Sequence, residues 1–155
     1  VKLERRTILD NGIRLVAMGD LEAIPQAPRK ALSSLIEESA DNDGMTLCLA
    51  LSYGGREEIA AAARDLASRA ASGELDPSDI DAGMVEENLW SSSLGPVDLM
   101  IRTSGELRIS NFMLWNLSYA ELFFTDCYWP DFDENSLEAA FSEYSTRQRR
   151  FGQVD

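Results

Sequence analysis

Short apolar runs alternate with stretches of helical periodicity along most of this chain. Four runs are each long enough for one buried strand, at residues 13–18, 45–52, 97–103 and 122–126. Helical patterns of apolar residues occur around residues 31–36, at 56–71 and at 136–150. Strands that alternate with helices are typical of a parallel sheet with helices on its faces. The sequence therefore predicts an α/β fold with an open, largely parallel sheet flanked by helices.

The absence of histidine removes whole classes of chemistry. With no His among 155 residues, a Ser-His-Asp triad, a Cys-His pair and every His-containing metal site are excluded. The net charge of −13 argues against a general nucleic-acid binder. Cys48 and Cys127 lie in separate apolar segments, which favours reduced core thiols and a cytoplasmic location. Any chemistry must use carboxylates, arginines, hydroxyls or a bound ion.

The length of the chain and of its apolar runs sets two further bounds. A chain of 155 residues suits a single domain, expected over residues 1–155. No apolar run approaches the ~20 residues that span a bilayer, so we expect at most peripheral contact with a membrane. Residues 1–16 read as the end of a helix that runs into a strand, and the first residue is Val1 rather than Met. We therefore expect the first strands of the fold to lie upstream of Val1.

The segment after the third apolar run is the strongest candidate for a binding site. In an open parallel sheet, ligands bind beyond the carboxyl ends of the strands. In the sequence "IRTSGELRISN", Arg102 lies at the expected strand end and Ser104-Gly105 in a turn. The expected helix start follows, with Arg108, Ser110 and Asn111. Two guanidiniums, a hydroxyl and helix-terminal N–H groups would form a diphosphate-sized anion site. The alternative is surface arginines paired with a carboxylate such as Glu106, and the pattern alone leaves both open.

Glu121 is a carboxylate in a hydrophobic neighbourhood, directly before the fourth apolar run. Such groups are paired, protonated or bound to a cation. Glu121 could be the structural partner of Arg102 or Arg108. It could also help to hold Mg²⁺, an ion that proteins bind through one or two carboxylates together with substrate phosphates.

Two features of the second apolar run have both an ordinary and a functional interpretation. Gly54-Gly55 after this run favours a tight turn over a phosphate site, because glycine is the default residue for unusual backbone dihedrals. Met45, Leu47 and Leu49 alternate on one face of the expected strand. By pattern they are core residues more often than the lining of an apolar channel.

The motifs together resemble a known family. The segment "DLMIRTSGELRISNFMLWNLSYAELFFTDCYWPDF", with "LALSYGGREEI" before it and "RQRRFG" near the end, closely resembles the cis-prenyltransferase family and, within it, the bacterial undecaprenyl diphosphate synthases. The similarity covers nearly the whole chain. It implies the C-terminal portion of the cis-prenyltransferase fold.

The resemblance also implies an activity and a role for each matching residue. Family members condense isopentenyl diphosphate onto an allylic prenyl diphosphate, need Mg²⁺ and make a long polyprenyl diphosphate for the cell-wall lipid carrier. The diphosphate of isopentenyl diphosphate would be held by Arg102, Arg108 and Ser110, Glu106 would be a further substrate-binding residue, and Glu121 would help to bind Mg²⁺. The elongation tunnel would be lined by Met45, Leu47 and Leu49. Arg150 and Gly152 match an Arg-x-Gly element that reaches across a homodimer to the partner's site.

The chain also departs from the family pattern. The family's Asp-Gly-Asn-Gly-Arg-Trp segment has no match, so its catalytic aspartate is expected upstream of Val1, and this chain alone could be inactive. Ser52 stands where asparagine is expected and Asn116 where glutamine is usual. Two alternatives stay open: a non-catalytic subunit of the same family, and an acidic interaction domain in which Arg102 and Glu121 form a structural pair.

Overall fold

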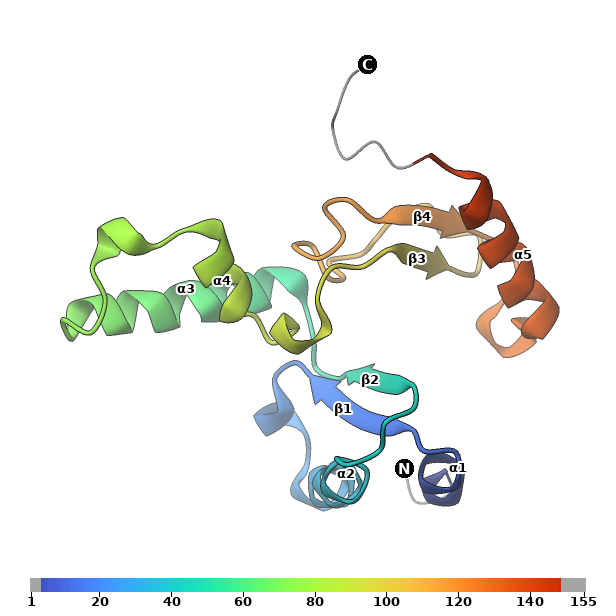
Figure 1. Ribbon diagram of the computed structural model, residues 1–155, viewed down its shortest axis with the longest axis horizontal. Coiled ribbons are helices and arrows are strands. Elements are labelled where there is room, and N and C mark those ends of the chain that lie inside the picture. Colours follow the sequence, from blue (N-terminus) through green and yellow to red (C-terminus); the bar gives the residue numbers. More distant parts are fainter. Residues whose placement is uncertain (1–3, 149–155) are drawn as a thin grey trace. The chain divides into compact units, whose positions relative to one another are not determined.

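The computed structural model describes residues 4–148, and the chain divides into two compact units between Trp90 and Ser91. We describe each unit by itself (Figure 1). The α/β class and the parallel pairing of strands are confirmed, with one two-stranded parallel ladder in each unit. The single domain over residues 1–155 stays a prediction.

The first unit begins with a helix that runs into a strand, as the sequence predicts. Its first elements are α1 (Arg5–Asp10), β1 (Arg14–Met18), the 3₁₀ turn η1 (Leu21–Ala23), α2 (Gln26–Glu38) and β2 (Thr46–Ala50). The two strands pair in parallel, from Arg14 opposite Thr46 to Met18 opposite Ala50. Figure 1 shows α1 and α2 on the same side of this pair.

The core of the first unit lies between these two helices and β1. It is formed by Ile8, Leu15, Leu32 and Leu35, one or two from each element. The core also holds a polar side chain, Ser39, whose hydroxyl accepts the Leu15 N–H at 3.0 Å and donates to the Ile36 carbonyl at 3.3 Å. Because Ser39 is fully buried, these bonds offset its loss of contact with water.

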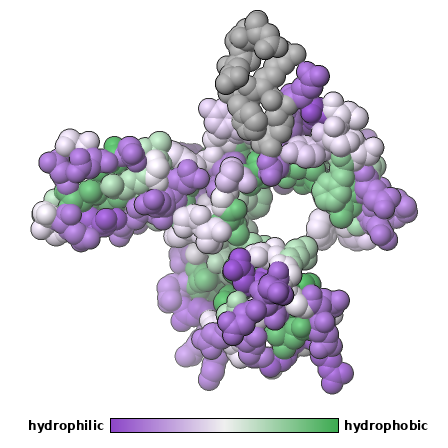
Figure 2. Space-filling model, viewed as in Figure 1, coloured by the Kyte–Doolittle hydropathy of each residue, from purple (hydrophilic) through white to green (hydrophobic). Residues whose placement is uncertain are grey.

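The long helix of the first unit is α3 (Gly55–Ala71), which confirms the helix expected at 56–71. Its buried face is formed by Glu58, Ala62 and Leu66, which repeat every four residues. The segment that follows α3 forms two short helical pieces, η2 (Pro77–Asp79) and α4 (Ala82–Glu87). Hydrophilic residues dominate the visible surface around α1 and α2 (Figure 2).

The second unit contains η3 (Ser92–Leu94), β3 (Leu99–Arg102), β4 (Glu121–Phe124), η4 (Trp129–Asp131) and α5 (Glu134–Thr146). The strands pair in parallel, from Leu99 opposite Glu121 to Arg102 opposite Phe124. Helix α5 packs against β4 and confirms the helix expected at 136–150, although it begins two residues earlier and ends at Thr146. Asp133 caps it by accepting the Ser136 N–H at 2.9 Å.

The prediction of a helix that starts near Ser110 is wrong. The connection between β3 and β4 consists of turns and bends, and Ser110, Asn111 and Met113 all have positive φ angles. A positive φ is incompatible with a right-handed helix, so the N–H groups of a regular helix start are not available here.

In residues 4–148, no helix is both long and apolar enough to cross a membrane.

Candidate functional site

Strained backbone marks two places in the described chain, each at the carboxyl end of a strand. The non-glycine residues with positive φ are Ser52, Ser104, Ser110, Asn111 and Met113. The first follows β2, and the other four lie in the connection after β3. Left-handed backbone costs a non-glycine residue about 1–2 kcal/mol and persists where the surroundings hold it, often at functional sites. These are also the positions at which parallel sheets bind ligands.

The two arginines after β3 differ in their partners. Arg102 ends β3 and is half-buried, and within residues 4–148 its guanidinium has no hydrogen-bond or ion-pair partner. Arg108 is 63% exposed and forms an ion pair with Glu106. The alternative of a carboxylate partner therefore describes Arg108 but not Arg102. An unpaired, half-buried cation at a strand end is a favourable position for an anion.

The backbone between these arginines is fixed by the neighbouring strand's continuation. The Ser104 N–H donates to the Cys127 carbonyl at 2.8 Å, and the Gly105 N–H donates to the Thr125 carbonyl at 2.9 Å. Ser104 and Gly105 form the expected turn, with φ angles of 69° and 67°. A Cβ at Gly105 would lie 3.0 Å from an Asp126 carboxylate oxygen, so the turn leaves little room for a side chain. The turn thus sets where the chain leaves Arg102 on its way to Arg108.

Glu121 is paired, as its hydrophobic setting predicts, but its partner is neither Arg102 nor Arg108. Arg147 Nη1 donates to Glu121 Oε2 at 2.8 Å. The register also separates Glu121 from Arg102, because Glu121 faces Leu99 at one end of the ladder and Arg102 lies at the other. Three residues of strand correspond to about 10 Å between those ends. The structure therefore excludes the Arg102–Glu121 structural pair.

The described residues do not by themselves fit a Mg²⁺ site. Within residues 4–148, no group of three or more Cys, Asp or Glu side chains lies close enough together to hold a metal ion. The one carboxylate assigned to Mg²⁺, Glu121, is engaged by Arg147, and hydrogen bonds to Glu143 and Glu121 raise the pKa of Arg147 above its ordinary value. A cation at Glu121 would have to compete with this guanidinium.

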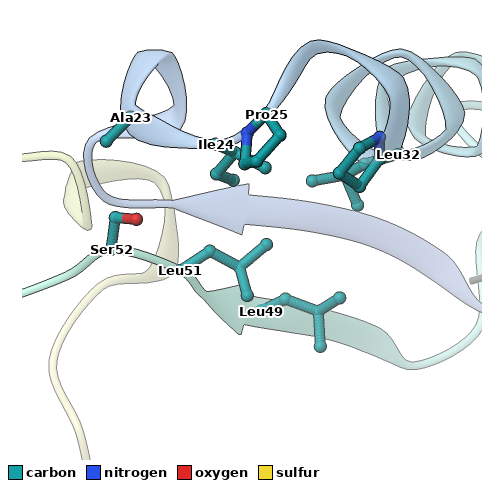
Figure 3. Close-up of a pocket in the computed structure, with 8 residues that line it drawn as sticks. Ala23, Ile24, Pro25, Leu32, Leu49, Leu51 and Ser52 are labelled. Atoms are coloured by element: carbon teal, nitrogen blue, oxygen red, sulfur yellow. The ribbon is translucent and has the colours of Figure 1, made fainter.

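An apolar pocket of about 420 Å³ lies at the carboxyl end of β2 (Figure 3). Seven of its eight lining residues are apolar, including Ile24 and Pro25 after β1, Leu32 from α2, and Leu49 and Leu51. Of the three predicted tunnel residues, only Leu49 lines this pocket. Leu47 packs against the core of the first unit, and Met45 is 63% exposed. The pocket volume suits a hydrocarbon chain.

One polar pair at this end of the first unit, Tyr53 with Glu58, was not predicted from the sequence. The tight turn expected at Gly54-Gly55 is wrong, because Gly54 is an extended N-cap residue (φ −152°, ψ 138°) and Gly55 is the first residue of α3, and both are buried. Beside them, the Tyr53 hydroxyl donates to Glu58 Oε2 at 2.5 Å. The spacing of Glu58 with Ala62 and Leu66, four residues apart, is the signal that would have placed this carboxylate on the buried face. Ser52 was noted only as a departure from the family pattern.

The remaining predicted residues have separate outcomes. Arg150 and Gly152 lie outside the described residues. Asn116 has a structural role, since Ser91 Oγ donates to its Oδ1 at 2.9 Å and its own Nδ2 donates to the Gly95 carbonyl at 3.2 Å. Cys48 and Cys127 are free, and burial raises the pKa of the Cys48 thiol.

Comparisons with known proteins decide the family. Residues 1–152 match a family model described as "Putative undecaprenyl diphosphate synthase". The chain belongs to this undecaprenyl diphosphate synthase family. An isoprenyl transferase of Porphyromonas gingivalis is 47% identical over 97% of this chain, and one of Bacillus subtilis is 42% identical over 95%. The matched part is 59% and 56% of those relatives, so the chain spans about three fifths of their length.

Solved structures of family members share the fold. Lavandulyl diphosphate synthase from Lavandula x intermedia, in complex with dimethylallyl diphosphate, superposes with a TM-score of 0.92 at 38% identity, covering 96% of this chain and 64% of that one. A "probable undecaprenyl diphosphate synthase" from Campylobacter jejuni superposes with a TM-score of 0.85 at 30% identity. The match covers 98% of this chain and 69% of that one. The undecaprenyl diphosphate synthase-like α/β fold is therefore confirmed.

Proposed function

We propose that the protein is a cis-prenyltransferase that condenses isopentenyl diphosphate onto an allylic prenyl diphosphate and makes a long polyprenyl diphosphate for the cell-wall lipid carrier. The observation that carries this proposal is the half-buried guanidinium of Arg102, which lacks a partner in residues 4–148 at the carboxyl end of β3. Arg108 and Ser110 follow it on the same connection. Family membership and the apolar pocket in the first unit support the assignment.

The residues present account for two parts of such a reaction. In the condensation the bond between the allylic carbon and its diphosphate breaks, a carbon–carbon bond to isopentenyl diphosphate forms and a proton is lost, while isopentenyl diphosphate keeps its own diphosphate. The guanidiniums of Arg102 and Arg108 would bind that retained diphosphate and so position isopentenyl diphosphate for the reaction. Arg108 would exchange Glu106 for a phosphate, and Arg102 would gain a partner. The apolar pocket would shield the growing hydrocarbon from water.

Several parts of the proposal extend beyond the described residues. The family resemblance implies Mg²⁺, for which these residues supply no set of ligands, so its requirement is tested in solution. We also propose a homodimer, supported by the exposed apolar side chains of Phe141 on α5 and Trp129 in η4, which are 53% and 74% exposed. The cytoplasmic location stays a prediction.

A turnover assay tests the proposal directly. The chain is incubated with farnesyl diphosphate and radiolabelled isopentenyl diphosphate, with and without Mg²⁺, and label in butanol-extractable product is measured. Product that elongates with time is the expected result. Binding of isopentenyl diphosphate without product would contradict turnover by this chain while keeping the diphosphate-binding assignment, and sedimentation of the same sample as a monomer would contradict the homodimer.

A further inference from the structure

The apolar pocket of the first unit has one polar side chain in its lining, that of Ser52. Ser52 follows β2 and is exposed, so this residue lies at an edge of the pocket that is open to solvent. Figure 3 shows this side chain beside Leu51 and near Ala23, with its oxygen toward the apolar lining. The Ser52 hydroxyl has no hydrogen-bond partner within residues 4–148.

The backbone at Ser52 is held in an unfavourable conformation. Its φ angle is 47°, in the left-handed region that non-glycine residues rarely adopt. The preceding residue donates its N–H to the Met18 carbonyl at 2.9 Å, and the Ser52 carbonyl accepts the Asp20 N–H at 3.2 Å. A Cβ at Gly19 would lie 2.0 Å from the Leu51 carbonyl oxygen, so the two chain segments touch there. The end of β1 therefore fixes this strained turn from one side.

Tyr53 fixes the turn from the other side. Its hydroxyl donates to Glu58 Oε2 at 2.5 Å, and Glu58 is fully buried in the first turn of α3. The Tyr53 ring also meets Trp90 edge-on, with centroids 6.2 Å apart. A hydrogen bond to a buried side chain holds Tyr53 in one orientation, and this restricts the residue directly before it.

We propose that the Ser52 hydroxyl donates a hydrogen bond to the diphosphate of a prenyl diphosphate whose hydrocarbon occupies the pocket, and that Glu58 is a positioning residue that acts through Tyr53. This inference rests on the proposed function and names a specificity-determining group for it. A fixed donor at the opening of an apolar pocket distinguishes a ligand with a charged end from one with a neutral end.

Two ligands with the same hydrocarbon test the inference. Farnesyl diphosphate and farnesol are titrated into the chain, and the quenching of tryptophan fluorescence gives the Kd of each. Ser52→Ala removes the hydroxyl and keeps the strained backbone, whereas Ser52→Gly removes the hydroxyl and relieves the strain. Both variants should raise the Kd of farnesyl diphosphate about tenfold, the size of one charge-assisted hydrogen bond, and leave the Kd of farnesol unchanged.

A double-mutant cycle tests the positioning role. Tyr53→Phe removes only the hydroxyl that donates to Glu58. It should raise the Kd of farnesyl diphosphate by less than Ser52→Ala does, and it should leave the Kd of farnesol unchanged. In the Ser52→Ala background, Tyr53→Phe should have no further effect, because its influence passes through the Ser52 hydroxyl. Tyr128→Phe, which removes a hydroxyl from a side chain that is 64% exposed, is the matched control and should change neither Kd.

The contradictory results are distinct. Equal weakening of both ligands by Tyr53→Phe, or an effect of Tyr53→Phe that adds fully to that of Ser52→Ala, would show a general structural role and overturn the positioning role. Tight binding of farnesyl diphosphate by Ser52→Ala and Ser52→Gly would overturn the role of Ser52 while leaving the proposed function intact. Failure of the folded wild-type chain to bind either ligand would overturn both.

Discussion

Arg147 joins the end of helix α5 to the start of strand β4 through Glu121. Its Nη1 lies 2.8 Å from Glu121 Oε2 and donates to the Leu122 carbonyl at 3.0 Å, while its Nη2 donates to Glu143 Oε1 at 2.5 Å. The Arg147 and Glu121 side chains are only 26% and 28% exposed. Because both are largely shielded from water and share several bonds, this ion pair should contribute more than an ordinary surface pair.

A double-mutant cycle measures that contribution. We expect Arg147→Gln and Glu121→Gln to show a coupling free energy of about 1 kcal/mol in urea unfolding. The Arg69–Asp65 pair, at 3.9 Å on the surface of α3, is the control and should couple by about 0.5 kcal/mol or less. Equal coupling in the two pairs would contradict this account.

The cap of helix α5 should make stability depend on pH in acid. Hydrogen bonds from the Ser136 N–H and hydroxyl lower the pKa of Asp133 below its ordinary value of 3.8. A lowered native pKa gives stability that is present above pH 3.8 and is lost as the pH falls through the native value. Asp133→Asn keeps a capping oxygen but does not titrate in this range. We therefore expect the wild type to have the higher unfolding midpoint at about pH 6 and the difference from Asp133→Asn to shrink as the pH falls. A difference in unfolding midpoint that stays constant from pH 6 to about pH 2.5 would contradict this.

Ser39 should be the costliest serine to replace in the first unit. It is fully buried and accepts the Leu15 N–H at 3.0 Å, so Ser39→Ala leaves a strand N–H without its acceptor. We expect a loss of about 1–3 kcal/mol in the free energy of unfolding. Ser33→Ala, at an exposed position of helix α2, which Ser39 directly follows, should change it by less than about 0.5 kcal/mol. Similar losses in both variants would be the contrary result.

Burial should slow the reaction of the Cys48 thiol with a disulfide reagent. Because desolvation raises the pKa of Cys48, less thiolate is present at a given pH and reaction with a disulfide reagent slows. In native protein at pH 8, we expect Cys48 to react markedly more slowly than in urea-unfolded protein. The Cys127→Ser variant isolates its signal, and equally fast labelling in both states would contradict the assigned burial.

The strands and long helices could be predicted because their signals are local. Each strand is a short apolar run bounded by turn residues, and the apolar positions of α5 repeat at helical spacing. The connection after β3 could not be predicted in the same way. Ser110 and Asn111 suit a helix start by residue type, but their left-handed backbone depends on how the chain returns to β4.

Pairings between distant residues were also hidden from the sequence. The expectation that Glu121 is paired was correct, yet 26 residues separate it from Arg147 and no spacing rule connects them. Glu58 was missed because a carboxylate is not read as part of a buried helix face, although its spacing with Ala62 and Leu66 fits one. The diphosphate-binding roles of Arg102, Arg108 and Ser110 stay predictions, and binding can test them.

The most direct test is a calorimetric titration of isopentenyl diphosphate into the chain, with and without Mg²⁺, for the wild type, Arg108→Ala and Arg64→Ala. Arg64 is an exposed arginine of α3 and controls for loss of positive charge alone. We predict saturable binding that Arg108→Ala weakens by about 2 kcal/mol or more, the scale of a charge-assisted hydrogen bond, and that Arg64→Ala leaves unchanged. An unchanged affinity in a folded Arg108→Ala variant would contradict the assignment of the connection after β3 as the diphosphate site.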